Sequence, residues 1–165
     1  MYDVTATGEL LIDFTRNGLS EQNNRIYEAN PGGAPCNVLA MLGKLGYKTA
    51  FIGKVGNDEF GKLLKNTISE QKIYSTGLIL DPDAKTTLAF VDNDETGDRS
   101  FSFYRKPGAD MMLREDEVNY ELIDNCRIFH FGSLSMTDEP VRSATYAMVD
   151  YAKKKIYEGI YCLFV

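Results

Sequence analysis

Two adjacent glycines at positions 32 and 33 run directly into a segment with helical periodicity, and this junction limits the possible folds of the chain. The apolar side chains after the glycines recur at the i, i+3, i+4 and i+7 positions of one helical face, namely Val38, Met41, Leu42 and Leu45. Pro35 suits the first helical turn, where its missing N–H leaves no donor unpaired. Gly46 suits a left-handed helix stop. We therefore predict an amphipathic helix that begins just after the glycine pair and ends near Gly46.

The same junction has the chemistry of a small-molecule site. Glycines allow a ligand to approach the backbone closely, and the start of a helix offers free N–H donors. Asn37 adds an amide side chain in the first helical turn. Gly32, Gly33 and Asn37 are therefore candidate residues for holding a polar, oxygen-rich small molecule. The alternative is a tight turn that only starts a buried helix, because short glycine patterns have many false positives.

Strand and helix patterns alternate along the chain. We predict a β-strand region at residues 2–14 that Gly8 interrupts, and strands at 48–55, 77–80 and 127–131. Besides the helix after the glycines, we predict helices at 58–71 and 116–124, and a long helix capped by Thr137 and Asp138. Residues 106–113 are predicted to be loop. This alternation predicts an α/β fold with a mainly parallel sheet flanked by helices.

An inserted β-hairpin interrupts this alternation. Residues 86–91 and 99–104 are both β-rich, and phenylalanine alternates with serine in the second run, as in a strand with one buried face. Residues 16–30 form a polar excursion with a short predicted strand at 25–29. An exposed hairpin rich in aromatic side chains needs a cover, either from the same domain or from a second copy of it.

Asp13 directly follows an apolar strand segment, residues 10–12. An acidic residue in this position is most often part of a turn or a helix cap. The alternative is a carboxylate that faces a cleft beyond the strand end, where α/β sheets bind their ligands. The residue pattern by itself leaves both interpretations of Asp13 open.

The composition argues against several classes of function. The chain has 165 residues, enough for one domain with a sizeable core, and its net charge of -6 gives no electrostatic support for binding nucleic acid. No apolar run reaches the length needed to cross a membrane, and we find no signal-peptide pattern. Cys36, Cys126 and Cys162 show neither disulfide nor zinc spacing, and a single histidine makes a metal site unexpected. We expect a cytoplasmic protein with reduced thiols.

Three glycine-containing blocks carry a family resemblance. Residues 32–37 contain Gly-Gly, a small residue and proline, and then an asparagine, and spaced glycines follow at 46 and 56. Residues 55–61 and 100–110 form two further blocks. Together these blocks resemble the PfkB, or ribokinase-like, carbohydrate kinases, and within that family the bacterial fructokinases most of all. The resemblance covers about residues 2–155 and implies the N-terminal portion of a ribokinase-like α/β fold.

This resemblance implies a sugar site on residues already considered above. Asp13 would accept hydrogen bonds from sugar hydroxyls, each worth ~1.5–3 kcal/mol because the acceptor is charged. Gly32 and Gly33 would let the sugar lie against the backbone, and Asn37 would bind another hydroxyl. The sugar is accordingly the expected partner of the chain.

The inserted strands, near 15–30 and 86–105, would form a lid that closes over the sugar and often pairs with the lid of another subunit. Tyr104 and Arg105 end the second lid strand, so both are candidates for contact with the sugar or its phosphorylated product. The alternatives are hairpin packing for Tyr104 and a solvated charge at the sheet edge for Arg105. We expect a homodimer formed through the lid strands.

Two other residues are set aside. His130 lies between phenylalanines on a predicted strand, so we expect a structural role. Asp110 belongs to a Gly-Ala-Asp sequence that is only faintly similar to the family's catalytic Gly-Ala-Gly-Asp loop and occurs far too early in the chain. We expect Asp110 to lie in a loop and not to act as the catalytic base.

The family's catalytic half is expected to be missing. In this family the catalytic aspartate, the anion-hole glycines and most of the nucleotide pocket lie in the C-terminal half, and no such motif occurs in this chain. We therefore assign none of its residues to catalysis, to ATP or to a metal. Residues 156–165 also depart from the family, although they have β-strand propensity, and we expect a truncated or frame-shifted product.

The resemblance thus predicts a fructokinase-type sugar kinase that uses ATP and Mg²⁺, represented here by its sugar-binding half and inactive alone. One alternative is a kinase for another substrate, such as ribose, 2-keto-3-deoxygluconate or a nucleoside. A sugar with a carboxylate would give Arg105 a strong role, whereas a neutral hexose would not. The other alternative is a non-catalytic sugar-binding or assembly module.

Overall fold

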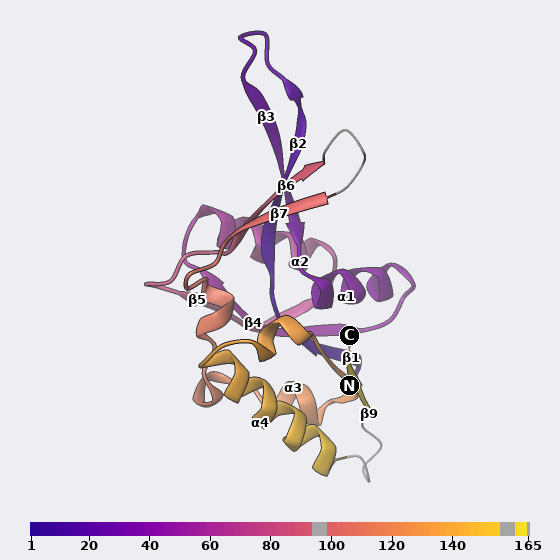
Figure 1. The fold of residues 1–165 in the computed structure, drawn as a ribbon. Helices are drawn as coiled ribbons and strands as arrows, with labels where there is room; N and C mark the ends of the chain where they lie inside the picture. Colours follow the sequence, from indigo (N-terminus) through magenta and orange to yellow (C-terminus); the bar gives the residue numbers. More distant parts are fainter. Residues whose placement is uncertain (94–98, 156–160, 165) are drawn as a thin grey trace.

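Two β-sheets of different character make up the fold (Figure 1). The computed structural model describes residues 1–93, 99–155 and 161–164. Five parallel strands form the main sheet, in the order β5-β4-β1-β8-β9. Their bounds are Tyr2–Thr7 (β1), Thr49–Gly56 (β4), Tyr74–Asp81 (β5), Cys126–Phe131 (β8) and Tyr161–Phe164 (β9). The prediction of a mainly parallel sheet is therefore confirmed.

Helices cover both faces of the main sheet (Figure 1). One face carries α1, Ala34–Lys44, and α2, Glu59–Glu70, over a core cluster that includes Leu39, Phe51 and Leu64. The other face carries α3, Glu121–Asp124, and α4, Val141–Lys154, over a second cluster that includes Ile52, Phe129 and Met148. Neighbouring residues Phe51 and Ile52 point into opposite clusters because side chains alternate along β4. The sheet is thus buried on both sides, as parallel sheets generally are.

The first helix begins where it was predicted but buries a different face. It starts at Ala34, directly after Gly33, with Pro35 in its first turn, and Gly46 has the positive φ of 91° of a helix stop. However, Met41 is 58% exposed and Leu45 is 67% exposed. The buried residues of α1 are Pro35, Cys36 and Leu39. Leu39 is the only one of these three with a large aliphatic side chain, so the packing face of α1 carries little of the periodic hydrophobicity used to predict it.

The second sheet has four strands in the order β3-β2-β6-β7 and projects from the body (Figure 1). Its strands are Leu11–Leu19 (β2), Arg25–Gly32 (β3), Leu88–Asn93 (β6) and Arg99–Tyr104 (β7). The outer pairs are antiparallel, whereas β2 and β6 run parallel. The predicted insertion is thus one sheet built from two hairpins that are far apart in the sequence, and we call it the lid sheet.

The β-strand region predicted at 2–14 is interrupted around Gly8, as expected, but its second part, residues 11–14, belongs to the lid sheet and not to the body. The first strand ends at Thr7, and β2 starts at Leu11 after a short connection. Ile12 is nevertheless fully buried, because the base of β2 still packs into the core cluster beneath α1 and α2. An apolar run alone does not specify the sheet in which a strand pairs.

Thr137 and Asp138 do not cap the long helix, contrary to the prediction. The helix begins at Val141 instead, after Pro140. Proline disfavours the helical conformation of the residue before it, which here is Glu139. The helix therefore starts after Pro140 instead of near Asp138. The Glu139 carboxylate accepts a hydrogen bond from the Ser143 N–H at 3.1 Å, and the Thr137 hydroxyl donates to the Leu134 carbonyl.

Short 3₁₀ helices occupy several connections. The predicted loop 106–113 contains η1, Ala109–Met112, and the predicted helix at 116–124 is divided into η2, Glu115–Glu117, and α3. A third, η3 at Ser133–Met136, follows β8. Part of the tail forms β9, which pairs in parallel with β8, while residues 156–160 and Val165 lie outside the described part.

Candidate functional site

The lid sheet has two chemically different faces. Directly paired residues share a face of a sheet, and successive residues alternate between faces. Asp13 pairs with Ala89, which in turn pairs with Phe103, so these three side chains lie on one face. Arg105 lines the same hollow as Phe103 and continues this face past the end of β7. We call this the Asp13 face, and Tyr104 belongs to the opposite one.

The Asp13 carboxylate is half-buried against the backbone of Gly32. A Cβ atom at position 32 would lie 2.2 Å from Asp13 Oδ2, so a larger residue there would displace the carboxylate from its position. Burial raises the pKa of the Asp13 carboxyl above its ordinary value. Among the described residues, no group donates a hydrogen bond to this carboxylate or pairs with it. Its lone pairs are therefore available to donors of a ligand.

The glycine turn rests on the segment that connects β1 to β2. Gly33 has a φ of 122°, and a Cβ atom there would lie 2.3 Å from the carbonyl oxygen of Glu9. Both the conformation and the close approach exclude larger residues. Glu9 also contacts the turn through its side chain, because Oε1 accepts a hydrogen bond from the Ala34 N–H at 2.9 Å. The turn is thus fixed from two directions.

Asn37 lies on the other side of Gly32 from Asp13. It is exposed in the first turn of α1, and its backbone N–H donates to the Gly33 carbonyl at 2.9 Å. Asn37 and Gly32 both line a narrow hollow of about 30 Å³ whose far wall is α2, and Asp13 does not line it. Asp13 and Asn37 are therefore both close to Gly32, but they do not line the same hollow.

Arg105 is buried and ion-paired, so the alternative of a solvated edge charge is wrong. Its Nε donates to Asp110 Oδ2 at 2.8 Å, and their side chains are 10% and 1% exposed. Asp110 also accepts a short hydrogen bond from the Thr87 hydroxyl, just before β6. Asp110 on η1 therefore has a structural role: its carboxylate joins the end of β7 to the start of β6, two adjacent strands of the lid sheet.

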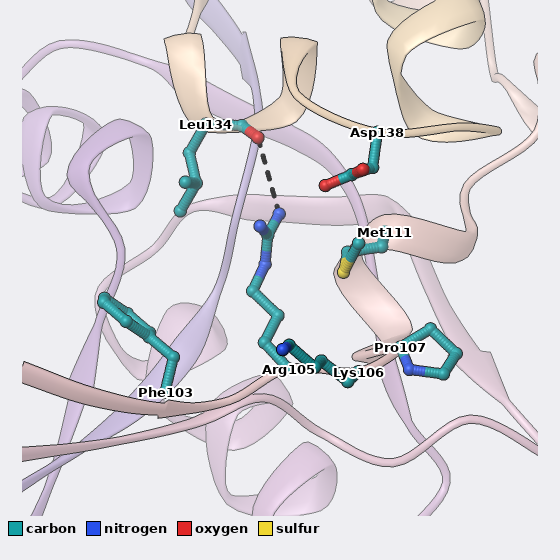
Figure 2. Close-up of a pocket in the computed structure, with 7 residues that line it drawn as sticks. All are labelled: Phe103, Arg105, Lys106, Pro107, Met111, Leu134 and Asp138. Carbon is teal, nitrogen blue, oxygen red and sulfur yellow. Dashed lines mark hydrogen bonds between the residues drawn. The ribbon is translucent and has the colours of Figure 1, made fainter.

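A hollow of about 370 Å³ opens beside Arg105. Its walls come from the end of β7 and from η1 and η3 and comprise Phe103, Arg105, Lys106, Pro107, Met111, Leu134 and Asp138. In Figure 2 the Arg105 guanidinium extends toward the Leu134 carbonyl, 3.5 Å away, and the Asp138 carboxylate lies nearby. This hollow lies on the Asp13 face of the lid sheet and is large enough for a small polar molecule.

Tyr104 takes part in an aromatic cluster on the opposite face. Its ring meets the edge of Phe90 at 5.4 Å, Phe90 stacks on Phe14 at 5.0 Å, and Phe14 contacts Phe60 of α2 at 5.6 Å. The Tyr104 side chain is still 68% exposed. The structure therefore shows the alternative considered for Tyr104, packing within the hairpin. The same aromatic cluster attaches the lid to α2.

Two buried charges were missed in the sequence. Glu9 is 6% exposed, and Lys54 is 2% exposed on β4. Lys54 Nζ lies 2.6 Å from Glu117 and 3.3 Å from Asp81, and it donates to the Met112 carbonyl at 3.0 Å. It thereby fixes the segment that carries η1 and η2. For Lys54 the available signal was a charge inside an apolar strand run, whereas Glu9 follows a glycine in a connection and gave no such signal.

The block at residues 55–61 has a structural explanation. Asp58 caps α2 by accepting the Gly61 N–H at 2.9 Å, and it also accepts the backbone N–H and the hydroxyl of Thr86. Although burial opposes it, these hydrogen bonds lower the pKa of the Asp58 carboxyl. A Cβ atom at Gly61 would lie 1.8 Å from the Gly56 carbonyl oxygen. The block therefore joins the start of α2 to the segment that enters the lid.

The remaining candidates give no catalytic centre. His130 is buried on β8, as expected for a structural histidine. Across residues 1–93, 99–155 and 161–164, no cluster of three or more histidine, cysteine or acidic side chains could hold a metal ion. In the same ranges, no helix is both long enough and apolar enough to span a membrane.

The parallel body, the lid sheet and the glycine turn define the class of ribokinase-like carbohydrate kinases. The model of the "pfkB family carbohydrate kinase" matches residues 1–163, and the chain belongs to this family. A probable chloroplastic fructokinase from Arabidopsis thaliana is 45% identical over 153 residues, which cover 92% of this chain and 40% of that protein. The resemblance noted from the sequence is therefore confirmed. The family match also continues past residue 155 to residue 163, so the expected departure from the family at 156 is wrong over that stretch.

Solved fructokinases have the same fold. The fructokinase of Xylella fastidiosa with bound ATP superposes with a TM-score of 0.89 at 33% identity and covers 99% of this chain and 51% of that one. The fructokinase of Vibrio cholerae in a form with fructose, ADP and calcium has a TM-score of 0.82 at 32% identity, covering 99% and 50%. The chain thus spans about half the length of these relatives.

The buried Arg105–Asp110 pair yields a prediction about stability. Replacing Asp110 with alanine leaves the Arg105 guanidinium buried without its partner, so we expect the free energy of unfolding to fall by about 3–5 kcal/mol. The exposed pair between Arg114 and Asp116 provides the control, because Asp116→Ala should cost less than about 1 kcal/mol. Urea unfolding followed by circular dichroism measures both. Equal losses in the two variants would contradict the account of Asp110.

Proposed function

We propose that this chain forms the sugar-binding portion of a fructokinase-type enzyme. In the whole kinase, the γ-phosphoryl group of MgATP would pass to a hydroxyl of a neutral sugar such as fructose. Membership of the pfkB family and the likeness to fructokinases support this class of reaction. The observation that carries the proposal is the half-buried Asp13 carboxylate without a protein partner among the described residues, held beside a glycine turn.

The chemistry of Asp13 suits sugar hydroxyls. Burial removes water from the Asp13 carboxylate, and the raised pKa of this group reflects the resulting loss of hydration free energy. New hydrogen bonds from a ligand would compensate that loss. A sugar offers several O–H donors in a fixed arrangement, whereas Gly32 leaves the backbone open to close approach. Two such hydrogen bonds to one carboxylate would both bind the sugar and select its hydroxyl geometry.

The pairing of Arg105 favours a neutral sugar over an acidic one. An arginine that binds a substrate carboxylate needs its charge available to the ligand. Here the Nε edge of Arg105 is taken by buried Asp110, so the pair is already close to neutral. In a 2-keto-3-deoxygluconate kinase, one of the alternatives, the ion pair between Arg105 and Asp110 would have to rearrange before Arg105 could bind the substrate carboxylate.

ATP and Mg²⁺ belong to the proposed activity of the whole kinase. When bound, MgATP would supply the phosphoryl group and the positive charge that neutralises it. The described residues offer no acidic cluster for the metal, so we assign no side chain of this chain to MgATP. We propose that these groups bind in the half of the family's length that this chain does not span, and that the chain alone binds sugar without turnover. A cytoplasmic location is part of the same proposal.

Sugar affinity tests the role of Asp13. We expect isothermal titration to detect fructose binding, with weaker binding of ribose and of 2-keto-3-deoxygluconate. Replacing Asp13 with alanine should raise the dissociation constant at least about 10- to 150-fold, because the loss of even one charge-assisted hydrogen bond costs about 1.5–3 kcal/mol. Asp150→Ala, at an exposed position on α4, is the matched control and should leave the constant unchanged.

Each outcome distinguishes between the alternatives. Tight binding of 2-keto-3-deoxygluconate that depends on Arg105 would replace fructose with an acidic sugar as substrate. Fructose binding without phosphorylation, measured by ADP release, agrees with a sugar-binding half. Fructose binding that is equal in the wild type and in Asp13→Ala would contradict the proposal.

We also propose that two copies of the chain associate through their lid sheets. Phe101 and Phe103 stack on each other at 6.0 Å on the Asp13 face, and they are 52% and 51% exposed. Ile26 is 41% exposed on β3, and register places it on the same face. Such a half-exposed apolar face on a projecting sheet is suited to pairing with an identical face.

Light scattering after size-exclusion chromatography tests this association. We expect a dimer for the wild type and a monomer for Phe101→Glu, because a buried unpaired carboxylate at the interface would be strongly unfavourable. Tyr146→Glu is the control, since Tyr146 is similarly exposed, at 49%, but lies on α4, far along the chain from the lid. A dimer that survives Phe101→Glu, or a monomeric wild type, would rule out pairing through this face.

A further inference from the structure

Glu9 is a buried carboxyl at the point where the body meets the lid sheet. It lies in the connection between β1 and β2 and is 6% exposed. Oε1 has a partner, the Ala34 N–H at 2.9 Å. Oε2 is buried and has no hydrogen-bond partner within the described residues. A buried carboxyl with one unsatisfied oxygen is costly, so it calls for a role that compensates the cost.

The surroundings of Glu9 enclose it between two glycines. A Cβ atom at Gly33 would lie 2.3 Å from the Glu9 carbonyl oxygen, and one at Gly132, after β8, would lie 3.2 Å from Oε2. The main chain and the side chain of Glu9 therefore both touch the backbone around it. Displacement of the carboxyl would break its hydrogen bond with the Ala34 N–H.

We propose that Glu9 is a positioning residue for the sugar site: it holds the glycine turn in place so that Gly32 stays against Asp13. The inference rests on the proposed function, because the site that it positions is the proposed sugar site. Glu9 itself does not touch Asp13 in this account. It acts through Ala34 and Gly33, whose carbonyl accepts the Asn37 N–H and so sets the first turn of α1.

The charge state of Glu9 supports this role. Burial raises the pKa of its carboxyl, and Asp110 adds to the rise, while the backbone N–H groups of Glu9 itself and of Ala34 and the charge of Arg105 oppose it. The neighbouring thiol of Cys36 also has a pKa raised by burial and by Glu9. A folded-state pKa above the unfolded value means that folding favours the protonated form. The stabilisation is complete below the ordinary pKa of 4.5 and is lost as the pH rises through the folded-state pKa.

The amide of Ala34 reports directly on this contact. In Glu9→Ala the hydrogen bond is removed, so we expect hydrogen exchange at Ala34 to become about five- to tenfold faster and fructose to bind more weakly by a similar factor. Glu9→Gln keeps a neutral acceptor at the same place and should restore both values. Glu59→Ala, a glutamate at an 88% exposed position on α2, is the matched control and should change neither.

A second measurement covers the case in which Glu9→Ala does not fold. In wild-type protein, the NMR chemical shift of the Ala34 amide should titrate with a midpoint above 4.5, and in Glu9→Gln this titration should disappear. An Ala34 amide that is unaffected by Glu9→Ala, or that titrates equally in Glu9→Gln, would overturn the inference. The measurements on the Ala34 amide need no sugar. A wild type that fails to bind fructose would therefore contradict the proposed function, whereas the contact between Glu9 and Ala34 would still be tested by the amide.

Discussion

The contact between Gly33 and the Glu9 peptide is the constraint on which the rest of the structure depends. The chain leaves the main sheet through the Glu9 segment to begin the lid, and it returns from the lid through Gly33 to begin α1. These two passages touch so closely that a Cβ atom at position 33 would lie 2.3 Å from the Glu9 carbonyl oxygen. The body, the lid and the first helix therefore have one common junction. The candidate sugar site lies at that junction.

Polar contacts at the lid roots complement this junction. Asp110 joins Arg105 after β7 to Thr87 before β6, and Asp58 joins the start of α2 to the neighbouring Thr86. Lys54 holds the segment that carries Asp110 in turn. Charged groups buried in this way contribute more to a unique arrangement than to net stability, because desolvation offsets much of their attraction. Together they connect the lid strands to α2 and to the main sheet.

Much of this arrangement could be predicted from local patterns in the sequence. Gly33, Pro35 and Gly46 mark the limits of α1 because each has a conformational preference that acts within a few residues. The packing face of α1 could not be predicted, because the helix packs on the sheet through Pro35, Cys36 and Leu39 while Met41 stays exposed. Periodic hydrophobicity therefore indicated the helix without identifying its buried side.

Features that depend on contacts between distant parts of the chain could not be predicted from the sequence. The assignment of Ile12 to the lid depends on pairing with β6, which lies more than seventy residues further along the chain. Of the candidate site residues, the structure places Asp13, Gly32 and Gly33 at one junction, whereas Tyr104 lies on the other face of the lid. Arg105 was a reasonable candidate, but its buried pairing with Asp110 depends on the folded loop between β7 and η1.

The central claim is that Asp13 and the glycine turn together hold a sugar. A crystal structure of this chain with fructose tests it most directly. The account predicts fructose hydroxyls within hydrogen-bond distance of the Asp13 carboxylate, with the sugar lying against the backbone of Gly32 and Gly33. Fructose bound elsewhere, for example in the hollow beside Arg105 without contact to Asp13, would contradict it.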